Sequence, residues 1–282
     1  MGRLINLELN KAIVNRWFIF SLLIASSLAL ASALIEADGA LAWSALKDGG
    51  SQEYLVMTTQ GAYGAWMLLG ADVAREAFFF LCPLLAIMPY AWSLRSEIVS
   101  GHIGQLYTRC PRCSYFMAKT LATLCTGFLI ISIPLLINFL ALSCLLPSYT
   151  PEAFDNLYLG INPGDAFARL FYSRPFLYVV ANVVTDGFLC GGWAICVLAI
   201  STLVDNRVIL LAGSYLFSIA MHFLSKVIFP AAGVTAFRFS LIDLTQGPGD
   251  VGRDPRALVV VLLAQIAFGI IVLYAQKERD AL

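Results

Sequence analysis

Few side chains of this sequence could carry out chemistry together. Cys110 and Cys113 have the two-residue spacing of redox dithiols, but the surrounding sequence does not predict the strand and helix of an oxidoreductase. Redox or metal chemistry is therefore poorly supported. His102 and His222 are the only histidines, and their wide separation gives little support for a metal site or a Ser-His-Asp triad. Because no glycine-rich phosphate-binding motif is present, we do not expect the chain to hydrolyse a nucleotide by itself.

Asp186 is the one acid that falls clearly inside an apolar run. A charge at such a position is costly in a membrane and usually faces protein or water. Asp186 and the nearby Asn182 could line a substrate path or fix a contact between protomers; alternatively, Asp186 is protonated or bonded to Asn182 or a neighbouring helix. Gly187 and Gly191 lie four residues apart, a spacing typical of close helix packing.

Two further polar groups lie at the ends of apolar runs. Asp72, Arg75 and Glu76 have helical spacing, and we expect them to neutralise one another at a helix end, with a substrate gate as the alternative. His222 and Lys226 are one helical turn apart. A lysine that extends to the membrane surface beside a histidine is favoured over an anion site.

Composition indicates a membrane protein. The chain has 282 residues, of which 60% are hydrophobic and 13% charged, whereas soluble proteins have about 25% charged residues. The net charge of zero argues against nucleic acid as a partner. Most of the seven cysteines fall in apolar runs, which indicates small buried side chains and not a disulfide framework.

The apolar runs predict an all-α polytopic membrane protein that forms a single transmembrane domain over residues 1–282. Residues 2–16 have the apolar spacing of an amphipathic interfacial helix. Six spans are predicted at 17–35, 77–94, 120–146, 176–204, 208–229 and 257–276. Six crossings place both termini on one side of the bilayer. The higher density of Lys and Arg in the segments on that side predicts that it is cytoplasmic.

The polar and basic segment 95–119 lies between the second and third spans. Its basic residues predict a cytoplasmic location, and its pattern indicates a surface helix and turn that another molecule could contact. Glu97, Gly101, Pro111, Arg112 and Lys119 follow one another in the order and spacing of the first cytoplasmic loop of type-2 ABC transporter permeases, which the segment resembles. In that family the loop is a coupling helix that docks on a separate ATPase subunit.

The resemblance implies that the chain is the permease subunit of an ABC exporter. Two protomers, identical or different, would form the substrate path in a bacterial inner or plasma membrane, and ATP and Mg would bind to the partner ATPase and not to this chain. Glu97, Gly101, Arg112 and Lys119 would contact the ATPase. Gly101 would permit a turn or close approach, Glu97 and Arg112 would supply charge-assisted hydrogen bonds, and Lys119 would anchor the next span at the headgroups.

Two other functions remain open from the residues. One is a non-transporting membrane sensor or immunity protein. The other is a membrane-embedded enzyme that uses Asp186, His222 and the cysteine pair, although these fall at different predicted membrane depths.

Overall fold

The computed structural model describes residues 2–45, 61–101, 111–151, 161–228, 238–247 and 252–278, and in these ranges it has helices and no strands. The helices, in chain order, are α1 (Gly2–Ile13), α2 (Arg16–Ala45), α4 (Val73–Ile87), α5 (Ser93–Val99), α7 (Arg112–Leu145), α9 (Ala168–Ser173), α10 (Pro175–Ile200), α11 (Arg207–Phe223), the π-helical turn η2 (Leu224–Ile228), α13 (Leu241–Thr245) and α14 (Pro255–Glu278).

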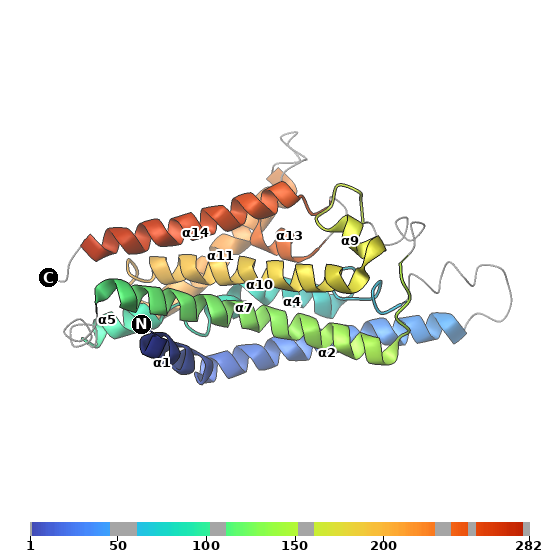
Figure 1. Cartoon of the computed structure of the whole chain (residues 1–282), viewed down its shortest axis with the longest axis horizontal. Helices are drawn as coiled ribbons and strands as arrows, with labels where there is room; N and C mark the ends of the chain where they lie inside the picture. Colours follow the sequence, from blue (N-terminus) through green and yellow to red (C-terminus); the bar gives the residue numbers. More distant parts are fainter. Residues whose placement is uncertain are drawn as a thin grey trace.

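The long helices run side by side along the longest axis (Figure 1). Helix α7 packs against α2 and α10, and α10 packs against α14. The start of α1 and the end of α14 lie toward one end of the bundle, which we call the α1 end; α9 lies toward the other, the α9 end (Figure 1). Five helices of the described part are long and apolar enough to cross a membrane: α2, α7, α10, α11 together with η2, and α14. The chain is thus a helical membrane protein.

The predicted span 77–94 is not one continuous helix. Helix α4 begins at Val73, where Asp72 accepts a hydrogen bond from the backbone N–H of Arg75, and ends at Ile87. Turns over 88–92 separate it from α5. Pro89 lies in these turns and cannot donate a helical hydrogen bond. The 15 residues of α4 rise about 22 Å, less than the roughly 30 Å of a hydrocarbon core.

The predicted span 17–35 ends too early, because α2 continues to Ala45. This stretch is rich in alanine, and Glu36 accepts a hydrogen bond from the backbone N–H of Ala71. Part of the stretch between the first two predicted spans packs inside the bundle, where Trp66 and Met67 are fully buried. The charge of Glu36 therefore does not mark the end of this helix.

Close packing between α7 and α10 depends on glycine. A Cβ atom on Gly191 would lie 2.8 Å from the Leu124 carbonyl oxygen, and one on Gly187 would lie 2.5 Å from the Ser132 hydroxyl oxygen. The predicted close-packing face of Gly187 and Gly191 is therefore confirmed, and its partner is α7. This contact sets the position of the α10 side chains described below.

Candidate functional site

A buried set of charged and phenolic side chains joins α1, α5 and α7 at the α1 end. Lys119 of α7 is fully buried, and its Nζ lies 2.8 Å from Glu97 Oε2 and 3.1 Å from Glu8 Oε2. The same ammonium group donates to the Tyr90 hydroxyl at 3.3 Å. Tyr90 in turn donates to Glu8 at 2.5 Å. Lys119 thus lies at the centre of the set.

Two more residues complete this set. Lys11 forms an ion pair with Glu97, and the Tyr115 hydroxyl donates to the other oxygen of the same carboxylate. We call the set the Lys119 cluster; its members are Glu8, Lys11, Tyr90, Glu97, Tyr115 and Lys119. Its two lysines and two glutamates neutralise one another, and this pairing allows the charges to be buried.

The sequence positions these groups through helical spacing. Leu4, Glu8 and Ala12 recur every four residues and therefore lie on one face of α1, the face that packs inward. Glu8 on this face meets Lys119, which lies two turns inside α7 because that helix begins at Arg112. Lys119 was expected to anchor a span at the headgroups; its full burial shows instead that it holds three helices together.

Helix α5 also has exposed residues beside the cluster. Val99 is 70% exposed and Ile98 is 38% exposed. A hollow of about 380 Å³ lies between α5 and residues 204–210, and another of about 450 Å³ lies between α5 and the end of α1. Both are lined in part by Trp92 and Ser96. The α5 surface, which we define as residues 95–101 with these two hollows, is a shaped surface at the α1 end.

Charged residues border the α5 surface. Arg95 forms an ion pair with Asp205, which is largely exposed. The guanidinium carbon of Arg207 lies 3.9 Å from the centre of the Trp92 ring, a cation–π contact. These contacts attach the turn before α11 to α5.

The structure brings together only two of the four residues expected to contact an ATPase. Glu97 and Lys119 pair with each other inside the protein. Gly101 is exposed just beyond the end of α5, with a φ of 70° that favours glycine. Arg112 is half-buried at the start of α7. Residues 102–110 of the predicted coupling segment, with Cys110, lie outside the described residues.

Asp186 and Asn182 lie far inside the bundle and contact a residue that the sequence did not single out. Arg253 donates to Asn182 Oδ1 at 2.6 Å and forms an ion pair with Asp186, and all three side chains are almost fully buried. The arginine is held there because its backbone N–H donates to Asp165 at 2.9 Å. The ion pair favours helix packing over a substrate path for Asp186.

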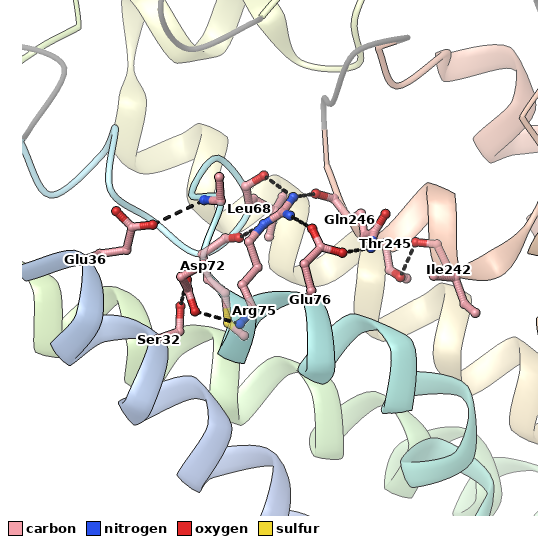
Figure 2. A network of polar contacts seen from close by, with 11 residues as sticks. Ser32, Glu36, Leu68, Asp72, Arg75, Glu76, Ile242, Thr245 and Gln246 are labelled. Carbon is pink, nitrogen blue, oxygen red and sulfur yellow. Dashed lines mark hydrogen bonds and ion pairs between the residues drawn. The ribbon is translucent and has the colours of Figure 1, made fainter. Parts of the chain in front are cut away.

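A second polar network lies at the start of α4, toward the α9 end (Figures 1 and 2). Arg75 donates to the carbonyl oxygens of Met67 and Gln246, each at 2.7 Å. Asp72 accepts from the Ser32 hydroxyl at 2.6 Å. Figure 2 shows that Arg75 lies between the segment before α4 and the end of α13. The expected self-neutralised helix end is present, since Arg75 forms an ion pair with Glu76, and Arg75 also connects two distant segments.

Of His222 and Lys226, only Lys226 is exposed. His222 is buried, and its Nδ1 lies 2.9 Å from Asp243 Oδ1 of α13. Asp186 and His222 therefore have different partners. Within the described ranges, no group of three or more His, Cys, Asp or Glu side chains could hold a metal ion.

Protonation of Glu97 should weaken the Lys119 cluster. Burial opposes ionisation of Glu97, but the nearby Lys119, with hydrogen bonds from Lys11, Lys119 and Tyr115, lowers its pKa below the ordinary value of 4.5. A lowered folded-state pKa contributes stability above pH 4.5, and that contribution is lost as the pH falls through the folded-state pKa. We therefore expect Glu97→Gln to lower the melting temperature at pH 7 and the difference from the original chain to shrink toward pH 3.

The measurement is thermal unfolding of both proteins in the same detergent at several pH values. Asp38→Asn is the control, because Asp38 is an exposed carboxylate on α2 outside the Lys119 cluster. A Glu97→Gln difference that stayed constant from pH 7 to pH 3 would contradict the assignment of the cluster charge to Glu97.

Comparison with known proteins returned no match to a family, to a curated protein or to a solved structure. The interpretation of the site therefore depends on its geometry and on the sequence pattern.

Sequence reasoning missed Glu8, Tyr90, Tyr115, Arg253 and Asp243 as members of the buried polar groups. A signal for Glu8 was available, since its four-residue spacing from Leu4 and Ala12 places it on the inward face of α1. The remaining pairs join residues far apart in the sequence, so helical periodicity gives no information about them.

Proposed function

We propose that this chain is the membrane-spanning permease subunit of a type-2 ABC exporter and that the α5 surface docks a separate ATPase subunit. The observation that carries the proposal is the construction of α5. One face is fixed through Glu97 to α1 and α7, while residues beside it on the same short helix are exposed. A contact surface that must transmit movement needs both a free face and a firm attachment.

The attachment provides a route for mechanical coupling. Lys119 belongs to α7, the longest helix of the described part, and the Lys119 cluster connects it directly with α5. Breaking a buried ion pair costs about 3–5 kcal/mol, so a partner that pushes on α5 would move α7 and α1 with it instead of detaching α5. In this proposal ATP closes the ATPase dimer, and the movement reaches the spans through the cluster.

The proposal assigns different roles to the four predicted contact residues. Glu97 and Lys119 position α5, and neither is the docking group itself. Gly101 and Arg112 remain proposed contacts at the two borders of residues 102–110. The apolar part of the contact is Ile98 and Val99, which are exposed on α5.

The proposed topology has six crossings. Helix α4 and the turns over 88–92 would complete the sixth, in addition to the five long helices, and α5 would lie at the cytoplasmic end of this crossing. Both termini would then lie in the cytoplasm of a bacterial cell, on the side of the ATPase, consistent with the position of α1 and the end of α14 at one end of the bundle (Figure 1). A second permease protomer would complete the substrate path, and ATP and Mg would bind to the ATPase.

Replacing Val99 with aspartate should reduce recovery of the ATPase with the tagged chain at least about tenfold, because a charge would enter an apolar contact at its centre. The measurement is co-purification in mild detergent, quantified against the tagged chain. Val73→Asp is the matched control, because Val73 is also exposed but lies at the start of α4, away from α5.

Arg112→Ala should reduce the amount of ATPase that co-purifies with the tagged chain less than Val99→Asp does, as expected for a charged residue at the border of an interface. Full recovery of the ATPase with both Val99→Asp and Arg112→Ala, in chains that insert normally, would remove the basis for docking at this surface.

A further inference from the structure

Two exposed arginines lie where α2 and α11 begin, at the α1 end of the bundle. Arg16 is the first residue of α2, and Arg207 is the first residue of α11. Within the described ranges, neither arginine forms an ion pair; Asp205, two residues before Arg207, pairs with Arg95 instead. This part of the surface therefore carries positive charge that no ion pair among the described residues neutralises.

Aromatic rings order the Arg207 side chain. Its guanidinium carbon lies 3.9 Å from the centre of the Trp92 ring and 5.2 Å from the centre of the Trp17 ring. Trp92 is itself held, because its indole N–H donates to the Met88 carbonyl oxygen at 3.0 Å. A guanidinium that contacts a ring through its face keeps the N–H groups at its edge free, and their planar fork matches the oxygens of a phosphate. Arg207 is therefore an ordered donor that has no acceptor in the described part of the chain.

The apolar surface beside these arginines places them at the level of lipid headgroups. Phe20, one turn into α2, is more than half exposed, and so are Val208 and Ile209 at the start of α11. In a membrane protein such side chains contact the acyl chains. Trp17 is also exposed, and tryptophan is enriched at the border between acyl chains and headgroups. A ligand of Arg207 would thus lie between hydrocarbon and water, where the phosphate of a phospholipid lies.

We propose that Arg207 binds the phosphate of an anionic phospholipid and that the charge of Arg16 adds to the attraction. The phosphate accepts two hydrogen bonds from the guanidinium edge. A lipid with net negative charge is favoured over a zwitterionic one, because the ammonium group of the latter offsets the attraction. A hollow of about 380 Å³, lined in part by Arg207 and Trp92, provides space for the headgroup beside α5. This binding requires no ATPase.

The test uses the full purified chain without an ATPase and native mass spectrometry from mild detergent with added lipid. Phosphatidylglycerol is the anionic probe, and phosphatidylcholine with the same acyl chains is the zwitterionic one. We expect one phosphatidylglycerol to bind with at least about fivefold preference over phosphatidylcholine. Arg207→Gln should abolish most of this preference. Arg207→Lys should reduce it about twofold, since an ammonium group keeps the charge but lacks the planar fork.

Arg256→Gln is the matched control. Arg256 is also exposed in the first turn of a long helix, α14, but contacts no aromatic ring in the described ranges. An unchanged lipid preference in Arg207→Gln would overturn the proposal, as would an equal loss in Arg256→Gln. Displacement of phosphatidylglycerol by an equal concentration of inorganic phosphate would identify a soluble phosphate compound as the ligand and would overturn it too.

Discussion

Replacing Lys119 with methionine should lower the free energy of unfolding by about 3–5 kcal/mol, because two buried carboxylates, Glu8 and Glu97, would lose their shared cation. Methionine keeps much of the apolar length of lysine, so loss of the charge is the main change. Helices α1 and α5 should separate from α7 before the rest of the chain unfolds. The measurement is equilibrium unfolding in mixed micelles, together with the rate of tryptic cleavage at Arg3 and Arg95.

Lys11→Met is the matched control for this prediction. Lys11 pairs with the same Glu97, but its side chain is 46% exposed, and such ion pairs contribute less than about 1 kcal/mol. If both lysine variants lost stability equally, Lys119 would not be the central charge of the cluster.

Replacing Arg253 with methionine should cost a similar amount, about 3–5 kcal/mol, because Asp186 would remain buried and unpaired. The double variant Asp186→Leu with Arg253→Met should recover most of this loss, since apolar residues of similar size often replace a buried ion pair without penalty. The measurement is a double-mutant cycle of unfolding free energies.

Arg256→Met is the control for position, because Arg256 is exposed at the start of α14 and such changes are usually within about 0.5 kcal/mol. Recovery in the double variant would assign Asp186 to packing. If the double variant regained stability but did not transport, the Asp186 carboxylate would also act in the substrate path.

Much of the arrangement of helices could be predicted from the sequence. Long apolar runs correctly located α7, α10, α11 and α14, because burial in lipid demands continuous apolar residues whatever the tertiary contacts are. Two boundaries were wrong for local reasons. Alanine-rich sequence carried α2 past Glu36, and the turns around Pro89 divided the predicted second span.

The sequence predicted the segment that holds the candidate site, but not the contacts that its side chains make. The loop pattern predicted Glu97 and Lys119 as ATPase contacts, whereas the structure pairs them with each other, and this contact depends on how α5 folds back against α7. Arg253 illustrates the limit further. Its burial depends on contacts with Asp165, Asn182 and Asp186, which all lie far away in the sequence.

The most direct test of the docking proposal places a photo-crosslinking amino acid at position 99 of the tagged chain in its native membrane. After irradiation and purification in mild detergent, the crosslinked partner is identified by mass spectrometry, with the same amino acid at position 73 as the control. We predict a nucleotide-binding ATPase joined at position 99 and absent from position 73. Recovery of the chain alone, or of an unrelated protein at position 99, would contradict the proposal.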